Sequence, residues 1–514
     1  MAQNGFLVCS PLMAETVEEM LSQMQHAKDV GADCIEIRLD CLNGYATTDL
    51  EQLLKARVLP TIVTYRLKSE GGKYEVDEKK RLDTLRLAHE LGADFIDVEL
   101  QVAFDFVSRI KDKKSSNCKI IVSNHISGRT PSTEDLSHLV VNMQSTGADI
   151  LKIVTTATNI TDVSRVFQLI PHCQVPIIAC VTGDRGLISQ LLGPKFGGYL
   201  IYGSIGSGKD STPGQPKLAD LTGHYKIGRL NSDTKVFGVI ANPVGHSKGP
   251  ILHNQAFRDA GFNGVYVPLL VDNLADFLKV YSAPDFAGFS VGIPHKEAAV
   301  TCCDEVQPLA QSIGAVNTIV RRQSDGKLIG YNTDCEGAIS AIEDGLKGET
   351  GSINSGSSSP LAGRTFVLVG AGGAGRALAF GAKQRGAHVI IANRNYERAK
   401  SLANSVGGEA IAVEQLNSFR PETGAVLANT SAVGMQPNVN ATPLSKEALG
   451  AYTLVFDAVY TPRETRLLRE AKEAGKIVVS GLEMFIRQAI GQYELFTGKP
   501  APTELIRKIV MKDF

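Results

Sequence analysis

Residues 365–384 read TFVLVGAGGAGRALAFGAKQ, and this stretch decides the fold of the chain around it. The apolar run 365–369 leads directly into the glycine-rich turn GAGGAG at 370–375, and a helical pattern follows the turn. A strand, a G-x-G-x-x-G turn and a helix in this order are typical of a dinucleotide-binding unit on a parallel sheet. The sequence therefore predicts such a unit here. The alternative is a tight strand-to-helix turn that binds nothing.

The glycines of this turn have separate expected roles. Gly370 permits the tight turn, Gly372 lets the backbone approach a pyrophosphate, and Gly375 lets the helix pack on the strand. Gly373 belongs to the same turn and is counted in the same cofactor site. The free N–H groups and the dipole at the helix N-terminus favour the anionic pyrophosphate.

The next strand-like run ends in Asn393-Arg394-Asn395 and supplies further candidate cofactor residues. An acidic residue there would bind the ribose diol of NAD, whereas an Arg can accommodate the 2′-phosphate of NADP. Asn393, Arg394 and Arg398 are therefore candidates, and the two arginines favour NADP. A solvated surface Arg is the alternative reading. The choice between NAD and NADP stays open.

Strand-like runs continue on both sides of this unit and define the second half of the chain. The Gly/Ser-rich stretch 347–360 between them predicts a surface loop. We predict a substrate-binding α/β domain at 235–345, a dinucleotide-binding domain at 361–481, and C-terminal helices at 482–514 that complete the former. The runs are 236–241, 265–271, 286–293, 318–321, 328–332, 388–392, 425–429, 454–458 and 477–480.

The first half, 1–227, alternates eight short apolar runs with amphipathic helical patterns. Continuous apolar runs are typical of buried parallel strands, and a (β/α)₈ barrel is their natural closure. The fold class is therefore α/β, with a barrel in front of a two-domain unit. The runs are 6–10, 34–40, 61–66, 95–100, 119–126, 150–156, 176–182 and 199–205.

Composition excludes several classes of partner. Lys and Arg number 53 against 54 Asp and Glu, so no charge excess favours nucleic acid or membrane, although small anionic substrates fit. The nine cysteines include no CxxC pair, which indicates reduced thiols and no metal site. An apolar run begins at Phe6, which leaves no room for a transit peptide. The chain as written is expected in the cytoplasm, with a plastid as the alternative if the N-terminus is processed.

Three polar clusters in the second half are candidate substrate sites. They are NPVGHSKGP at 242–250, IPHKE at 293–297, and GAVNT at 314–318 together with GYNTD at 330–334. The last two place Lys296 and Asp334 just past strands, where α/β enzymes carry their chemistry.

These clusters, in this order around the glycine-rich turn, resemble the shikimate dehydrogenase family from 236 to 514. With the barrel in front, the chain is similar to the plant bifunctional dehydroquinate dehydratase/shikimate dehydrogenases. The resemblance implies that Lys296 and Asp334 form the catalytic pair, in which a Lys of lowered pKa accepts a hydroxyl proton. A surface ion pair is the alternative. The resemblance also implies a substrate site at Ser247, Asn317, Tyr460 and Gln488, and cofactor contacts at Gly481 and Met484.

Two departures from this family concern the substrate carboxylate. Gly249 stands where the family has Ser in SKSP, and Gly292 stands where it usually has Thr. Each lost hydroxyl should cost about 1.5–3 kcal/mol, so shikimate binding should weaken by roughly two to four decades. Two glycines also open space for quinate, whose tetrahedral C1 carries an extra hydroxyl. The pair resembles the plant quinate dehydrogenases, which tend to use NAD(H), and Asn395 in place of Thr or Ser tilts the cofactor the same way.

The barrel resembles the type I 3-dehydroquinate dehydratases, which use a Schiff-base Lys and a His for proton transfer. Lys152 within the sixth strand and His125 at the end of the fifth match these residues. The family has an Arg that clamps the substrate carboxylate where this chain has Gln190, so reduced dehydratase activity is expected. Other matching substrate residues are Glu36, Arg38, Arg66, Glu70, Ser211 and Gln215.

We therefore predict an NAD(P)-dependent oxidoreductase whose main reaction interconverts quinate and 3-dehydroquinate, with shikimate and 3-dehydroshikimate as the second candidate pair. The alternative is a fully bifunctional dehydratase and shikimate dehydrogenase that uses NADP. A lesser alternative is a binding module without catalysis. The expected partners are small cyclohexane-carboxylate substrates, and the sequence predicts no oligomeric state.

Overall fold

The computed structural model describes residues 5–111, 117–206, 214–347 and 359–513. The predicted substrate residue Ser211 and most of the predicted loop 347–360 lie outside the described residues. The chain forms two compact units, which are Met1–Val236 with Asn263–Asp285, and Phe237–Phe262 with Phe286–Phe514. The domain boundaries expected from the sequence stay predictions.

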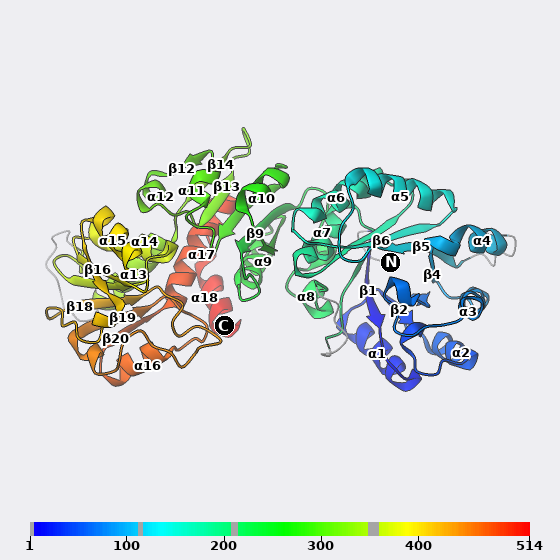
Figure 1. Ribbon diagram of the computed structural model, residues 1–514, viewed down its shortest axis with the longest axis horizontal. Coiled ribbons are helices and arrows are strands. Elements are labelled where there is room, and N and C mark those ends of the chain that lie inside the picture. The colour runs from blue at the N-terminus through cyan, green and yellow to red at the C-terminus, as the bar shows by residue number, and fades with distance from the viewer. Residues whose placement is uncertain (1–4, 112–116, 207–213, 348–358, 514) are drawn as a thin grey trace. The chain divides into compact units, whose positions relative to one another are not determined.

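The first unit contains a barrel of eight parallel strands in the order β7-β6-β5-β4-β3-β2-β1-β8. The backbone N–H of Tyr199 donates to the carbonyl of Ile177 at 2.8 Å, which joins the two ends of this order. Helices alternate with the strands and surround them in Figure 1. The strands are β1 (Leu7–Leu12), β2 (Cys34–Arg38), β3 (Thr61–Thr64), β4 (Phe95–Glu99), β5 (Lys119–His125), β6 (Ile150–Thr156), β7 (Ile177–Thr182) and β8 (Leu200–Tyr202).

The barrel closes because its strands are buried on both faces. Every residue of β3, β4 and β8 is buried, as continuous apolar runs require. Parallel strands bring their carboxyl ends to one rim, which positions side chains from several strands together. The alternating helices are α1 (Val17–Val30), α2 (Thr47–Ala56), α3 (Glu78–Glu90), α4 (Leu100–Lys111), α5 (Thr133–Ser145), α6 (Asp162–Leu169), α7 (Ile188–Leu192) and α8 (Leu218–Thr222).

A second, mixed sheet has the order β10-β9-β11-β13-β14-β12. Strand β13 pairs antiparallel with both β11 and β14. The elements of this region are β9 (Lys235–Ala241), α9 (Gly249–Asp259), β10 (Gly264–Leu270), α10 (Leu274–Val280), β11 (Phe286–Val291), α11 (Ala299–Cys302), β12 (Glu305–Val306), α12 (Pro308–Ile313), β13 (Thr318–Arg321), β14 (Leu328–Tyr331) and α13 (Asp334–Lys347).

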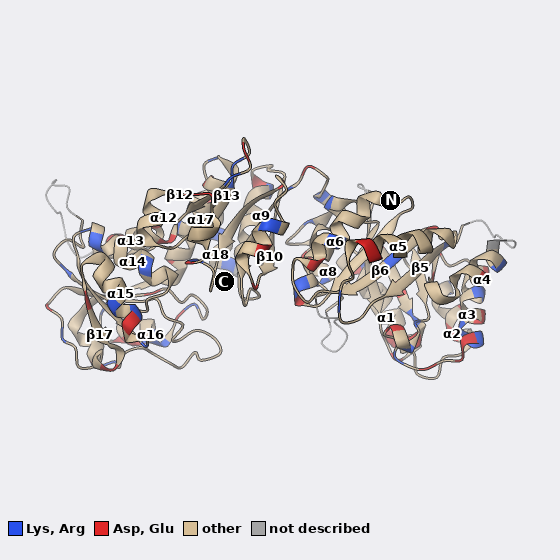
Figure 2. Cartoon of the chain, turned by 45° about the horizontal axis from the view of Figure 1, so that its top comes forward, with Lys and Arg blue, Asp and Glu red and all other residues tan. Residues whose placement is uncertain are grey.

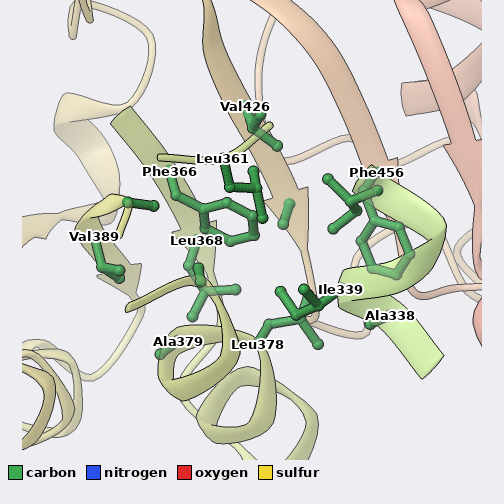
Figure 3. Close-up of a cluster of buried hydrophobic side chains, with 14 of the residues drawn as sticks. Ala338, Ile339, Leu361, Phe366, Leu368, Leu378, Ala379, Val389, Val426 and Phe456 are labelled. Atoms are coloured by element: carbon green, nitrogen blue, oxygen red, sulfur yellow. The ribbon is translucent and has the colours of Figure 1, made fainter. Parts of the chain in front are cut away.

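A third sheet is parallel, in the order β17-β16-β15-β18-β19-β20. This is the doubly wound order whose switch point lies between the first strand, β15, and β18. Figure 3 shows Phe366 and Leu368 facing Leu378 and Ile339 across one side of the sheet, in a fully buried cluster. The elements are β15 (Thr365–Val369), α14 (Gly373–Gln384), β16 (His388–Asn393), α15 (Tyr396–Val406), β17 (Glu409–Ala412), β18 (Ala425–Asn429), β19 (Tyr452–Asp457), α16 (Arg466–Glu473), β20 (Ile477–Ser480), α17 (Gly481–Thr497) and α18 (Thr503–Asp513).

The predicted fold class is confirmed, with a barrel followed by a two-sheet α/β unit. The sequence reading missed the short strands β12 and β17. The predicted helical tail forms two helices, because Gly498 ends α17 in a left-handed conformation and Pro500 and Pro502 follow it.

Charge is mixed over both units, since blue and red segments alternate along the helices in Figure 2. Within the described ranges, no helix combines the length and the apolar character needed to cross a bilayer. The same residues contain no cluster of His, Cys, Asp and Glu with the makings of a metal site.

Candidate active sites

A buried ionic network surrounds Lys152 in the barrel. Its ammonium group contacts Asp97 at 3.0 Å and Glu36 at 3.1 Å, and these side chains project from β6, β4 and β2. Burial alone would lower the pKa of Lys152, but Asp97 and Glu36 outweigh it, so the pKa is raised. The resting amine is therefore an ammonium ion. It must lose a proton before it attacks a carbonyl.

His125 ends β5 and is held by Glu70. The Glu70 carboxylate lies 3.0 Å from Nδ1 of His125 and accepts its backbone N–H at 3.1 Å. Burial, together with Arg66 and Lys152, holds the pKa of His125 well below its ordinary value. Burial raises the pKa of Glu70 to about 7. A neutral imidazole beside a titrating carboxyl suits proton transfer near neutral pH.

These residues line one cavity of about 320 Å³ at the carboxyl ends of the strands. Three cationic side chains line it within the described residues, and each is already paired with acidic groups. Arg66 binds Asp97 and Glu99 at 2.7 and 3.1 Å, and Arg38 forms a bidentate pair with Asp40. The predicted residues that line the cavity are Glu36, Arg38, Arg66, Glu70, His125, Lys152, Gln190 and Gln215.

Gln190 lies on α7 with its amide turned toward the protein. Its Oε1 accepts the backbone N–H of Tyr202 at 2.8 Å, and a hydrogen bond also joins it to Cys180. The Tyr202 hydroxyl and the Nε2 of Gln215 are both buried, and neither has a hydrogen-bond partner among the described residues. The wall at Gln190 therefore offers neutral polar groups in place of a charged fork.

In the second unit, Lys296 and Asp334 meet as expected. The Lys296 ammonium lies 2.5 Å from Oδ2 of Asp334, which begins α13. The backbone carbonyl of Lys296 accepts the N–H of Val316 at 2.8 Å, so the turn after β11 is fixed. The pair is half-open, with 18% of the Lys296 side chain exposed against 5% for Asp334.

Asn317 is buried, and its amide organises the loop before Asp334. Its Nδ2 donates to the Thr333 hydroxyl and its Oδ1 accepts the Thr333 N–H, both at 2.8 Å. Gln492 of α17 donates to the carbonyl of Asn317 at 3.2 Å and accepts from the Ser290 hydroxyl at 2.7 Å. The sequence reading missed Gln492, although its position four residues after Gln488 placed both on one helix face.

The predicted carboxylate pocket follows β9 and β11. Ser247 lies in the loop before α9, and its hydroxyl accepts the N–H of Gly249 at 3.3 Å. A Cβ at Gly292 would lie 3.0 Å from Cβ of Ala241. The space in that direction is therefore filled, and the expectation that Gly292 opens room needs correction. The missing hydroxyl is the difference that remains at this position.

Tyr460 and Gln488 approach from the C-terminal part of the chain. Burial and the Asp334 carboxylate raise the pKa of Tyr460 to about 12, and its ring lies 5.0 Å from that of Phe485. Gln488 packs beside α13, because a Cβ at Gly337 would lie 3.1 Å from its backbone nitrogen. The Gln488 amide donates to the carbonyl of Phe485 at 3.1 Å.

The glycine-rich turn shows why it needs glycine at its ends. Gly370 has φ +105°, and a Cβ there would lie 2.8 Å from the Thr430 hydroxyl. A Cβ at Gly375 would lie 2.3 Å from the carbonyl of Gly370, so helix and strand pack closely. Nothing lies within 4 Å of a Cβ at Gly372, where a pyrophosphate would approach the N-terminus of α14. These residues fit a dinucleotide.

The rim beyond β16 holds the predicted arginines. Arg394 and Arg398 are exposed, and Asn395 caps α15 by accepting the N–H of Arg398 at 3.2 Å. Asn393 donates to the carbonyl of Asn395 at 2.9 Å.

Two further predicted cofactor residues lie at the start of α17. A Cβ at Gly481 would lie 2.4 Å from the carbonyl of Ala458, so this helix begins tightly against the turn after β19. Met484 is buried in the hydrophobic cluster of the third sheet, which gives its side chain a packing role.

Family models match most of the chain. They are type I 3-dehydroquinase over 8–232, shikimate dehydrogenase substrate binding domain over 239–319, shikimate / quinate 5-dehydrogenase over 354–464, and shikimate 5'-dehydrogenase C-terminal domain over 481–511.

Known proteins resemble the chain at full length and in its second half. The chloroplastic bifunctional 3-dehydroquinate dehydratase/shikimate dehydrogenase of Arabidopsis thaliana is 59% identical, covering 99% of this chain and 85% of that protein. The shikimate dehydrogenase (NADP(+)) of Bacillus mycoides is 38% identical, covering 54% and 98%. The Listeria monocytogenes shikimate 5-dehydrogenase, solved with shikimate and NAD, is 30% identical with a TM-score of 0.46, covering 54% and 96%. The predicted resemblance is confirmed, and the chain belongs to the bifunctional 3-dehydroquinate dehydratase/shikimate dehydrogenase family.

Proposed function

We propose that the second unit oxidises a ring hydroxyl of a cyclohexane carboxylate with NAD or NADP. The observation that carries this proposal is the Lys296–Asp334 pair beside the glycine-rich turn: a Cβ at Gly373 would lie 2.8 Å from Cδ of Lys296. A bound NAD or NADP would supply the acceptor for the hydride of the carbon that bears the hydroxyl. The hydroxyl proton passes to the neutral amine of Lys296, and Asp334 orients that amine. The product is a ketone, and no other oxidant is needed.

Between the two candidate acids, the residues favour quinate, which would be oxidised to 3-dehydroquinate. The Arabidopsis and Bacillus relatives are named for shikimate, which supports the alternative of a fully bifunctional enzyme. Gly249 and Gly292 argue against it because neither supplies a hydroxyl to the substrate carboxylate. A site that leaves a charged acceptor short of donors loses affinity, whereas quinate brings one more hydroxyl to anchor the ring.

Initial rates with quinate and shikimate against NAD and NADP test this preference. We expect a higher kcat/KM for quinate, and a higher value for shikimate would overturn the proposal. The substitutions Gly249→Ser and Gly292→Thr should move the preference toward shikimate. Gly292→Thr needs Ala241→Gly beside it, because the new Cβ would otherwise press on Ala241 at 3.0 Å. Ala241→Gly alone is the matched control and should leave the preference unchanged.

For the barrel, we propose a 3-dehydroquinate dehydratase of reduced activity. In the proposed reaction the neutral amine of Lys152 condenses with the substrate ketone and releases water. The iminium, which forms with one added proton, acidifies the adjacent carbon, and His125 removes the proton of that carbon. The imidazolium then gives this proton to the neighbouring hydroxyl, which leaves as water, and hydrolysis releases the product and restores Lys152. The reduced rate follows from Gln190, whose oxygen is held by the Tyr202 N–H, and from cavity cations that are already paired.

Borohydride reduction in the presence of 3-dehydroquinate tests the barrel directly. Trapping on Lys152 should be slow and incomplete at substrate concentrations that saturate an Arg-containing relative. Stoichiometric trapping together with normal turnover would contradict the reduced activity. Absence of any trapping together with normal turnover would contradict the Schiff-base route itself.

The name of the Arabidopsis relative includes a chloroplast location, and this supports a plastid over the cytoplasm for the present chain. A tagged full-length precursor followed by fractionation of plastids would test this location.

A further inference from the structure

Glu297, the residue after Lys296, lies between two arginines of the dinucleotide-binding fold. Its Oε1 contacts Nη2 of Arg398 at 2.6 Å, and its Oε2 lies 3.5 Å from Nη2 of Arg376. Arg376 belongs to the first turn of α14, and Arg398 belongs to the first turn of α15. One carboxylate from the turn after β11 therefore pairs with an arginine from each of two helix N-termini, α14 and α15.

The arginine that Glu297 holds is also the one expected to meet a 2′-phosphate. In this fold the adenosine ribose lies beyond the end of the second strand, here β16, at the start of the following helix. Arg398 is at that place, and it also donates to the carbonyl of Ala371 in the glycine-rich turn at 3.3 Å. A 2′-phosphate would compete with Glu297 for Arg398 and would be repelled by the carboxylate. The 2′-hydroxyl of NAD would meet neither effect.

The Glu297 side chain can leave Arg398 without moving the catalytic amine. The carbonyl of Lys296 is fixed by the Val316 N–H at 2.8 Å, and Nζ of Lys296 is held by Asp334 at 2.5 Å. The Glu297 side chain is 41% exposed, so water can take its place beside Arg398 when the residue is substituted. Cofactor choice at Glu297 is thus separable from proton transfer at Lys296.

We propose that Glu297 is a specificity-determining residue that disfavours NADP relative to NAD by occupying Arg398. This inference rests on the proposed dinucleotide site and deepens it. It also resolves the conflict between two arginines that favour NADP and a glycine pair that resembles NAD-using enzymes. Both Arg394 and Arg398 are present, but the charge of Arg398 is already neutralised by Glu297.

Two adenosine fragments test the proposal without the nicotinamide end. Calorimetry measures Kd for 2′,5′-ADP and for 5′-AMP on the full-length chain and on Glu297→Gln. Removal of the carboxylate should lower Kd for 2′,5′-ADP by about three- to tenfold and leave that for 5′-AMP within about twofold. The ratio of kcat/KM for NADP over NAD should rise by the same factor. Because Lys296 serves both cofactors, any loss of catalysis cancels in this ratio.

Control variants make the result specific. Glu336→Gln also removes a carboxylate from an arginine pair, with Arg385 at 3.0 Å, and should change neither Kd. Glu297→Ser repeats the test without an amide that could still accept from Arg398. In Arg398→Met, the further change Glu297→Gln should no longer affect 2′,5′-ADP.

The outcomes distinguish a failure of the proposed role of Glu297 from a failure of the proposed dinucleotide site. If both fragments tighten equally, or if 2′,5′-ADP does not tighten, Glu297 does not select the cofactor although the dinucleotide site stands. If the full-length chain binds neither fragment nor NAD(H) or NADP(H), the proposed dinucleotide site fails and this inference fails with it.

Discussion

The two lysines expected to carry the chemistry occupy opposite electrostatic settings. In the barrel, Lys152 is almost fully buried and contacts two carboxylates that are themselves buried. In the second unit, 18% of the Lys296 side chain is exposed, and its ammonium group pairs with the carboxylate of Asp334. The first amine is therefore embedded in a fixed network, and the second lies at the edge of an open site.

The difference follows from what each amine must do. A covalent nucleophile benefits from a rigid environment that fixes its approach to a carbonyl. Asp97 serves two cations at once, since Arg66 and Lys152 hold its pKa well below the usual value despite its burial. In the proposed mechanism Lys296 instead exchanges a proton with a substrate that enters and leaves, which requires access. Buried networks couple activity to stability, and open pairs do so weakly.

The largest expected effect is the separation of the two activities. Lys152→Met should abolish dehydration because, within the described residues, Lys152 is the lysine that lines the barrel cavity. Lys296→Met should lower dehydrogenase kcat by roughly 10²- to 10⁴-fold, the usual contribution of a general base. Each variant should retain the other activity within about twofold, by parallel assays on one preparation. Loss of both activities in either variant would contradict the assignment of one activity to each lysine, because the two sites would then depend on each other.

Stability should separate the same two variants. Lys152→Met leaves Glu36 buried without its cation, which should cost about 3–5 kcal/mol. Lys296→Met removes a partly exposed pair and should cost about 1 kcal/mol or less. Hydrogen exchange in peptides of β4 and β6 measures the loss of stability in Lys152→Met. Exchange in peptides of α13 measures the loss in Lys296→Met. Equal losses of stability in the two variants would show that the difference in burial between Lys152 and Lys296 does not affect the stability of the protein.

Much of this arrangement could be predicted from local sequence. Lys152 lies within one apolar run and His125 ends another, and parallel strands closed into a barrel bring the side chains of neighbouring strands together. The glycine-rich turn likewise carries its own strand and helix. Strand β12 has two residues, too few for any periodicity, and so it was missed.

Contacts between distant residues left no such signal. Glu36 reaches Lys152 across 116 positions of sequence, and Arg398 reaches Glu297 across 101. The local sequence around either residue does not indicate its partner, because the pairing depends on how the strands are arranged in the folded sheets. The room at Gly292 was misjudged for the same reason, since Ala241 comes from another strand.

A positive charge restored at position 190 of the barrel wall should raise dehydratase activity. Gln190→Arg would give the cavity a guanidinium in addition to its three paired cations, and one charged hydrogen bond is worth about 1.5–3 kcal/mol. Dehydratase kcat/KM should therefore rise by roughly ten- to a hundredfold, read by initial rates. Gln190→Met is the neutral control and should give no gain. If Arg also gives none, the existing cations already hold the carboxylate.

The smallest expected effect is a change in pH dependence confined to the barrel. The pKa of Glu70 is about 7 because burial penalises its charged form, so the group is protonated below that pH and ionised above it. The ionised carboxylate accepts Nδ1–H of His125 and leaves Nε2 free as a base, whereas the protonated acid donates to Nδ1 and removes that base. His125 itself stays neutral, since burial keeps its pKa well below the ordinary value.

Dehydratase kcat/KM should therefore rise with pH through about 7 as Glu70 loses its proton. Glu70→Gln should flatten this limb, because an amide neither gains nor loses a proton there. The dehydrogenase profile of the same samples should not change, because Glu70 is bonded to His125 of the barrel site, whereas Lys296 pairs with Asp334. A limb that persists unchanged in Glu70→Gln would assign the titration to Lys152, and the fixed network would then govern the proton as well as the carbon chemistry.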